Sequence, residues 1–109
     1  MIKYLVVPYL NEGVLENEFY TSLTNVLYVE SAGDNPQSNT LNVYYNVYSE
    51  TSGAVSVVEI DFNENQIDNE GLIWFQNLVE TALREDYTKV IYEVENLPPN
   101  LTINQMYIS

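Results

Sequence analysis

The chain has 109 residues, of which 16 are Asp or Glu and only 3 are Lys or Arg, so its formal net charge at pH 7 is -13. It contains no His and no Cys, which excludes histidine-based catalysis, cysteine nucleophiles, disulfides and the metal centres that need these ligands. Three cations cannot neutralise a run of phosphates, which excludes direct binding to nucleic acid or to an anionic membrane surface.

The composition indicates one folded domain over residues 1–109. Hydrophobic residues make up 46% of the chain, which is enough to form a core and argues against disorder. Charged residues make up 17%, below the average of about 25% for globular proteins. The net charge therefore reflects a shortage of Lys and Arg more than an excess of acid.

The first part of the chain is predicted to consist mainly of strands. The apolar run over residues 2–7 indicates a strand that ends at Pro8. Residues 14–22 stay open between helix and strand, because their apolar residues have helical spacing in a short stretch. Residues 23–31 favour a strand through their Val, Leu and Tyr content, and residues 32–39 carry the Gly, Asp, Asn and Pro of a loop.

A β-hairpin is predicted over residues 40–62. Residues 40–49 alternate between apolar and polar side chains, which is typical of a strand with one face on the core. Residues 50–53 end in Gly53 and form a short turn, and residues 54–62 follow as the second strand. The alternation also predicts which face of each strand is buried.

One amphipathic helix is predicted at about residues 69–86. Asp68 is expected to cap its N-terminus. The negative charge of Glu70, in the first turn, is expected to interact favourably with the helix dipole. Trp74 is expected to lie on a different side of the helix from the apolar residues that face the sheet. The stripe that should pack on the sheet consists of Leu72, Phe75, Leu78, Val79, Ala82 and Leu83.

Two more strands are predicted after the helix, at residues 87–95 and 101–108, with a break at Pro98 and Pro99. Strands in runs with a single helix among them favour the α+β class. We expect a mainly antiparallel sheet of about five to six strands, with the helix packed on one face.

Tyrosine is the most abundant aromatic residue, with 10 Tyr against 3 Phe and 1 Trp. Tyr44 and Tyr48 lie with Asn42 and Asn46 on the polar face of one strand. Tyrosine is enriched at protein interfaces, although it also fills half-buried sheet faces. We interpret these four residues as a candidate protein–protein interface.

Two pairs of carboxylates have the spacing of one strand face: Glu59 with Asp61, and Glu93 with Glu95. Residues at i and i+2 lie about 7 Å apart on a strand. If both pairs face away from the helix they form an acidic band, which could imitate the phosphates of a nucleic acid in a basic groove of another protein. Ordinary solvated strand faces explain the same pattern.

The turn before the helix contains an incomplete calcium motif, Asp61, Asn63 and Asn65, because oxygens at alternate positions open an EF-hand loop. Gln66 replaces the required glycine and Leu72 replaces the bidentate Glu, so we expect no metal. We also expect no other cofactor.

An enzyme is not expected. No His can act as a base for the serines and threonines, and the glycines are isolated, so a phosphate-binding loop is missing. We therefore expect no small-molecule substrate. The sequence shows neither a secretory signal nor a run of about 20 apolar residues, which favours a cytoplasmic protein or a component of a virion assembled there.

Together these observations favour a non-enzymatic structural or assembly protein that acts through protein–protein contacts, by self-association or within a larger assembly. The short, base-poor, Asn- and Tyr-rich composition is typical of small viral proteins, so a small phage virion subunit is our specific expectation. The alternative is an acidic inhibitor that mimics nucleic acid and blocks a basic site on a host protein.

Overall fold

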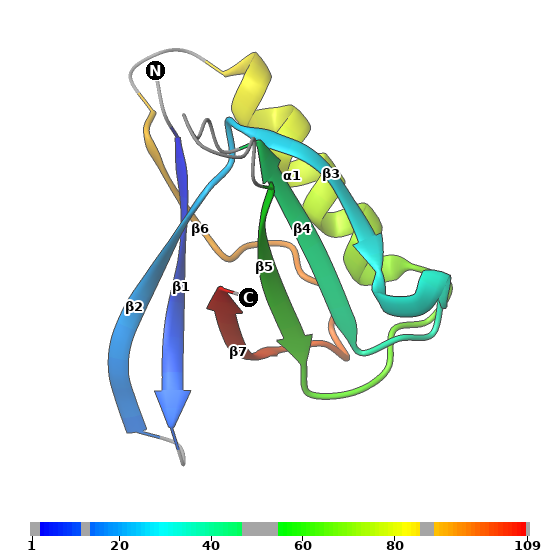
Figure 1. Cartoon of the computed structure of the whole chain (residues 1–109). Helices are drawn as coiled ribbons and strands as arrows, with labels where there is room; N and C mark the ends of the chain where they lie inside the picture. Colours follow the sequence, from blue (N-terminus) through cyan, green and yellow to red (C-terminus); the bar gives the residue numbers. More distant parts are fainter. Residues whose placement is uncertain (1–2, 12–13, 47–54, 86–88, 109) are drawn as a thin grey trace.

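The computed structural model describes residues 3–11, 14–46, 55–85 and 89–108, which form two β-sheets and one α-helix (Figure 1). The small sheet has the strand order β2-β1-β6, with β1 at Tyr4–Asn11, β2 at Val14–Ser22 and β6 at Ile91–Glu93. The large sheet has the order β3-β4-β5-β7, with β3 at Val26–Ser31, β4 at Thr40–Asn46, β5 at Val55–Phe62 and β7 at Ile103–Ile108. Helix α1 spans Glu70–Arg84, and a short 3-10 helix, η1, spans Ala32–Asp34. The predicted α+β class is confirmed.

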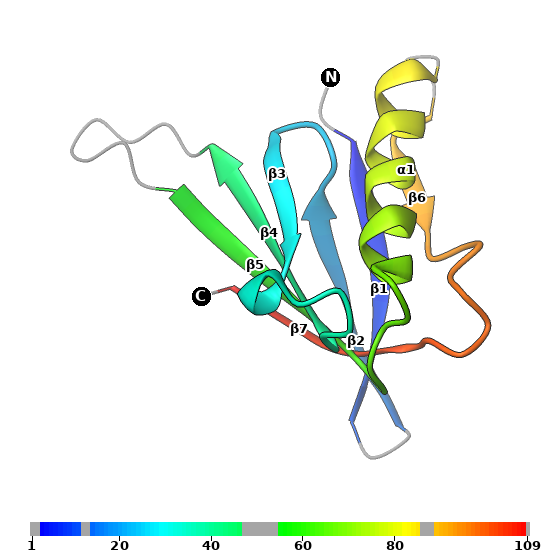
Figure 2. The same ribbon diagram turned by 90° about the vertical axis from the view of Figure 1, so that its right-hand side faces the viewer.

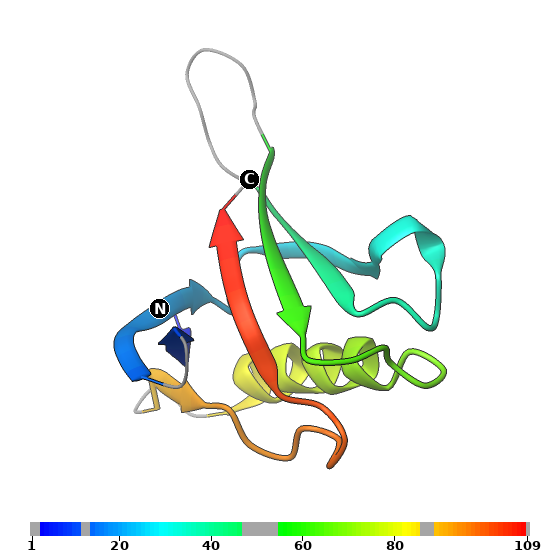
Figure 3. The same cartoon turned by 90° about the horizontal axis from the view of Figure 1, so that it is seen from below.

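The strands divide into two sheets, where the sequence led us to expect one. Strand β6 pairs with β1 in parallel, with Tyr4 opposite Ile91, while all other strand pairs are antiparallel. Figure 3 shows β5 and β7 side by side in one sheet, while β1 belongs to the other sheet and approaches β7 without pairing with it. Alternation along a strand identifies its buried face but does not identify its neighbours.

Residues 14–22, left open by the sequence, form strand β2, which pairs with β1 as an antiparallel hairpin. Strand β1 does not end at Pro8 but continues to Asn11, and Pro8 lies opposite Glu18. Strand β6 pairs only with Tyr4–Val6, so β2 is the one neighbour that β1 has near Pro8 among the described strands. A proline lacks a backbone N–H and is tolerated where one side of a strand is unpaired.

Strands β4 and β5 pair antiparallel, as the predicted hairpin requires, and their register places Val43 opposite Val58 and Asn42 opposite Glu59. The described residues of their inner face are buried and contribute much of the core: Leu41, Val43, Tyr45, Val58, Ile60 and Phe62. The turn predicted at residues 50–53 lies outside the described residues.

Tyr45 connects the two sheets. Its side chain is buried, and its hydroxyl donates to the backbone oxygen of Ser22 at 2.6 Å. The hydroxyl of Thr21, also on β2, lies 2.8 Å away. Burial raises the pKa of Tyr45, while the hydrogen bond with Thr21 opposes the shift. The neutral phenol is therefore a fixed contact between β4 and the end of β2.

Helix α1 packs on the sheets through the predicted stripe, with one exception. Phe75 and Ala82 are fully buried, whereas Leu83 is 64% exposed and does not belong to the core. Trp74 is also buried, at 7% exposure, because the segment after β6 covers its side of the helix. The helix is therefore packed on two sides rather than one. Within the described ranges, no helix has the length and hydropathy needed to cross a bilayer.

The predicted cap, Asp68, does not cap the helix. The N-cap residue is Asn69, which has a left-handed φ of 60° and makes no side-chain cap hydrogen bond. The carboxylate of Asp68 accepts a hydrogen bond from the side-chain amide of Gln37 at 3.0 Å. The left-handed backbone at both residues turns the chain into the helix, so the Asp68 side chain points to the neighbouring loop.

Gln66 supplies the missing cap from the core. It is 1% exposed, and its Oε1 accepts from the backbone N–H of Leu72 at 2.9 Å. Its Nε2 donates to the backbone oxygen of Ser38 at 2.8 Å and to the hydroxyl of Ser31 at 3.1 Å. One buried amide thus joins the start of α1 to the end of β3 and to the loop before β4.

Candidate interaction surfaces

The outer face of the large sheet is the side that points away from α1, and Figure 2 shows the helix on the opposite side. The strand register aligns polar and aromatic residues in rows across it, with Tyr28 opposite Tyr44 and Asn42 opposite Glu59. These side chains alternate with the buried core residues. The described members of this face are Tyr28, Glu30, Thr40, Asn42, Tyr44, Val57, Glu59, Asp61 and Gln105.

Two tyrosines form a stacked pair on this face. The rings of Tyr28 and Tyr44 have centroids 4.3 Å apart and planes inclined by 16°. The Tyr44 hydroxyl donates to Glu30 Oε1 at 2.7 Å, and Tyr28 remains 53% exposed. The hydrogen bond to Glu30, with burial and the negative charge of Glu30, raises the pKa of Tyr44 to about 12. The hydrogen bond therefore keeps the Tyr44 phenol neutral and holds its ring in the stacked pair.

Of the four predicted interface residues, the structure describes Asn42, Tyr44 and Asn46. Asn42 and Tyr44 lie on the outer face, as their alternation suggests, and Asn46 ends strand β4. Tyr48 lies outside the described residues. Sequence reasoning missed Tyr28, because its position opposite Tyr44 depends on a bulge between Val26 and Tyr28 that no local pattern indicates.

The two acidic pairs are not brought together on one sheet face. Glu59 and Asp61 lie on the outer face of the large sheet, where Asp61 accepts from the Thr40 hydroxyl at 2.9 Å and from the Gln105 amide at 3.3 Å. Glu93 belongs to β6 of the small sheet, and Glu95 follows it. The predicted continuous band is absent among these four residues because β6 pairs with β1 instead of with the large sheet.

Two of the three residues of the incomplete calcium motif bind different partners, and the third is exposed. Asp61 binds side chains on the outer face, while Asn63 Oδ1 accepts from the backbone N–H of Thr102 at 2.7 Å. Asn65 is exposed. No group of three or more Asp or Glu suited to a metal ion occurs in the described part of the chain. Asn63 instead connects its turn to the segment before β7.

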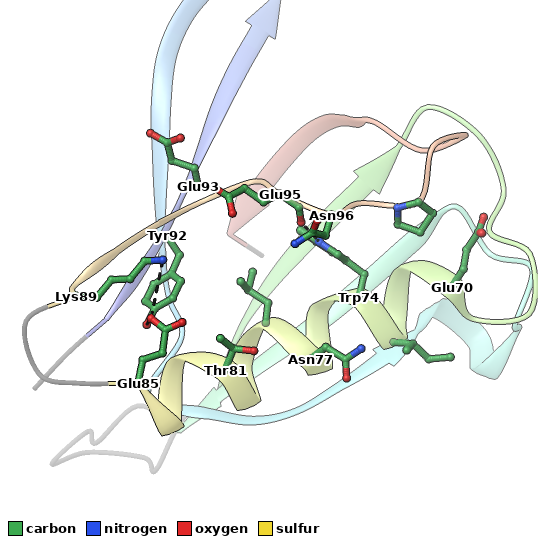
Figure 4. A pocket seen from close by; sticks show the side chains of 13 residues that line it. Glu70, Trp74, Asn77, Thr81, Glu85, Lys89, Tyr92, Glu93, Glu95 and Asn96 are labelled. Carbon is green, nitrogen blue, oxygen red and sulfur yellow. Dashed lines mark hydrogen bonds and ion pairs between the residues drawn. The ribbon is translucent and has the colours of Figure 1, made fainter.

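A second surface is a groove of about 550 Å³ between α1 and the segment of residues 89–98 (Figure 4). Two aromatic side chains, Trp74 and Tyr92, form part of its wall. The indole Nε1 of Trp74 donates to the backbone oxygen of Glu95 at 2.7 Å, which holds the segment against the helix. The groove is also lined by Glu70, Ile73, Asn77, Leu78, Thr81, Glu85, Lys89, Glu93, Glu95, Asn96 and Pro98.

Two of the chain's three cations surround Tyr92. Lys89 Nζ lies 4.6 Å from the ring centroid and 3.8 Å from Glu85 Oε2. The buried Lys3 donates to the backbone oxygen of Glu85 at 3.0 Å and to the Tyr92 hydroxyl at 3.4 Å. That hydroxyl donates in turn to Glu85 Oε2 at 2.9 Å. Burial, with the hydrogen bond and charge of Glu85, raises the pKa of Tyr92 to about 12.

The molecule thus offers an aromatic and polar sheet face and an acidic groove on the helix side. Sequence patterns indicated residues of both surfaces, but not that Trp74 and Tyr92 meet across one groove, because their separation along the chain hides the contact. Searches among protein-family models, curated proteins and solved structures found no match to this chain.

Proposed function

We propose that this chain is a non-enzymatic assembly protein that acts through protein–protein contacts on the outer face of the large sheet. A small subunit of a virion is the specific form of this proposal, and a second copy of the chain is the first partner to consider. The absence of His and Cys from the sequence supports a non-enzymatic role.

The observation that carries the proposal is the stacked pair of Tyr28 and Tyr44. Tyr28 is 53% exposed, so a partner would bury a substantial aromatic area on contact. The hydrogen bond from Tyr44 to Glu30 fixes the pair before binding, which reduces the conformational entropy lost on association. Rigid aromatic residues with polar tips are enriched in binding hot spots.

The net charge determines how self-association must respond to salt. A second copy also carries a charge of -13, so two copies repel each other at low ionic strength. Salt screens this repulsion, while contacts through the tyrosine pair are mainly apolar and persist. Self-association is therefore expected to strengthen as salt increases.

Sedimentation velocity over a range of protein concentrations, at about 20 mM and about 500 mM NaCl, tests the proposal. We expect larger species that increase with salt and that Tyr28→Ser abolishes. Leu83→Ser is the matched control, because Leu83 is also a large exposed hydrophobic residue, 64% exposed, and lies on α1 away from the outer face. A protein that stays monomeric at high salt, or a control that dissociates as fully as Tyr28→Ser, contradicts the proposal.

The alternative function, an acidic inhibitor of a nucleic-acid-binding protein, predicts the opposite salt response, because attraction between an acidic and a basic surface weakens as salt rises. Glu59 and Asp61 offer one acidic pair on the outer face for this role. The position of Glu93 on the other sheet removes the continuous band on which the idea rested.

A further inference from the structure

We propose that the groove between α1 and residues 89–98 binds an extended segment of a partner protein that carries arginine or lysine side chains. This surface lies on the helix side of the molecule, away from the outer face of the large sheet, so the proposal goes beyond self-association and stands independently of it.

Charge complementarity selects a cationic occupant. Four carboxylates line the groove, against the single ammonium of Lys89. In Figure 4, Glu85 points from the end of the helix toward Lys89 and Tyr92, Glu95 lies on the opposite side of the groove, and the Glu93 side chain extends from the same segment away from the helix. The Tyr92 ring between them is covered by Lys89 and is only 4% exposed, so a cation from a partner can stack on it only in place of the Lys89 ammonium. The groove therefore combines the two features that bind guanidinium and ammonium groups.

The position of Lys89 shows how a cation is held there. Its ammonium lies 4.6 Å from the centroid of the Tyr92 ring and 3.8 Å from Glu85 Oε2. The side chain is 50% exposed, and the ion pair is long, so Lys89 is held loosely. An arginine from a partner can displace it, because a planar guanidinium stacks on the ring and donates to more than one carboxylate. Lys89 thus acts as an internal competitor for the site.

The shape of the groove favours an extended segment over a single small cation. Its carboxylates run from Glu70 at the start of α1 to Glu85 just after its end. A helix of this length extends about 22 Å, which an extended peptide covers in about seven residues. A segment with basic residues at both ends can therefore reach Glu70 and Glu85 together.

Trp74 makes the groove directly observable, because it is the only tryptophan of the chain and lines the site. The probe is a synthetic peptide of alternating glycine and arginine, titrated at low salt while tryptophan emission is recorded. We expect a saturable change in emission. The same peptide with neutral citrulline in place of arginine is expected to leave the emission unchanged, since it keeps the shape and loses the charge.

Two comparisons test whether the peptide binds in the groove, each between variants that change the charge equally inside and outside it. Glu93→Gln/Glu95→Gln is expected to weaken binding about tenfold, whereas Asp34→Asn/Glu64→Gln removes two exposed charges outside the groove and is expected to have little effect. Lys89→Gln is expected to tighten binding by freeing the Tyr92 ring. Arg84→Gln removes the same charge outside the groove and serves as its control.

The proposal fails if Glu93→Gln/Glu95→Gln and Asp34→Asn/Glu64→Gln change the affinity equally, because binding would then follow net charge alone. It fails likewise if Lys89→Gln and Arg84→Gln have equal effects. It also fails if the citrulline peptide binds as well as the arginine peptide, or if the tryptophan emission does not respond. Urea unfolding of each variant confirms that the fold is retained. Because Tyr28→Ser does not touch the groove, its peptide affinity should equal that of the wild type even where self-association is lost.

Discussion

At the scale of single residues, the one buried cation among the described residues, Lys3, has a structural role. Lys3 is 5% exposed, and its ammonium donates to the backbone oxygen of Glu85, directly after α1. A cation at a helix C-terminus interacts favourably with the helix dipole and satisfies a carbonyl that has no partner in the helix. The Tyr92 hydroxyl accepts from the same ammonium and donates to the Glu85 carboxylate. The end of α1, the start of β1 and strand β6 therefore share one hydrogen-bond network.

Tyr92 gives the fold a pH dependence in the alkaline range. The pKa of Tyr92 is raised from 10.0 to about 12, so folding favours the neutral phenol. This contribution to stability is complete below pH 10 and is lost as the pH rises toward 12. The free energy of unfolding of the wild type, measured with urea at several pH values, should therefore fall more steeply above pH 10 than that of Tyr92→Phe. Equal slopes for both proteins would contradict this assignment.

At the scale of elements, the sequence predicted structure where the pattern is local. The alternation along β4 and β5 correctly identified Val43 and Ile60 as buried. Successive side chains of a strand point to opposite faces, so covering one face of the sheet buries every second residue. The apolar period of α1 likewise identified Phe75. The prediction was wrong for Leu83, since the register of the helix against the sheet decides whether the edge of a stripe is covered.

Long-range contacts could not be predicted in this way. Gln66 appeared in the sequence only as a residue that breaks a calcium motif, yet it caps α1 from the core. The groove and the stacked tyrosines also depend on pairings between distant segments, of β6 with β1 and of β3 with β4. Propensity and periodicity carry no information about such partners.

The contact between α1 and β5 depends on Gly71. A Cβ atom at this position would lie 2.6 Å from the ring of Phe62, which is itself 1% exposed and cannot move freely. Alanine is ordinarily the better helix former by about 1 kcal/mol, but overpacking a core costs about 1–3 kcal/mol. We therefore expect Gly71→Ala to reduce the free energy of unfolding by up to about 2 kcal/mol in urea titrations.

The matched control for this prediction is Gln76→Ala, at an exposed position of the same helix, which should change stability little. A further check introduces Gly71→Ala into a Phe62→Leu variant, in which the side chain at position 62 is smaller. If the clash is the cause, Gly71→Ala should be less harmful in the Phe62→Leu background than in the wild type. A Gly71→Ala protein more stable than the wild type would show that helix propensity outweighs packing here.

At the scale of the whole molecule, charge repulsion opposes the fold. The chain carries a net charge of -13, and the ion pairs between described side chains join Arg84 to Glu80 and Lys89 to Glu85. Both pairs are exposed neighbours on the surface, and such pairs contribute little to stability. Salt therefore screens many repulsions and few attractions.

We expect the melting temperature to rise with NaCl concentration in dilute protein, by about 4–8 °C for each kcal/mol of repulsion that salt removes. Differential scanning calorimetry between about 10 mM and about 500 mM NaCl measures this effect. The Asp34→Asn/Glu64→Gln variant, with less repulsion, should show a smaller rise. A melting temperature that falls with salt would mean that attractive pairs dominate.

The parallel pairing of β1 with β6 also determines the order in which the chain can fold. Tyr4 lies opposite Ile91, so this edge of the small sheet forms only when residues almost a chain length apart meet. The β1–β2 hairpin and the β4–β5 hairpin close short loops and can form early, whereas the β1–β6 contact carries a large loop-closure entropy. Until β6 arrives, the backbone of Tyr4–Val6 keeps one hydrogen-bonding edge open. We therefore expect that a second chain can pair at this edge during synthesis, and that docking of β6 closes it.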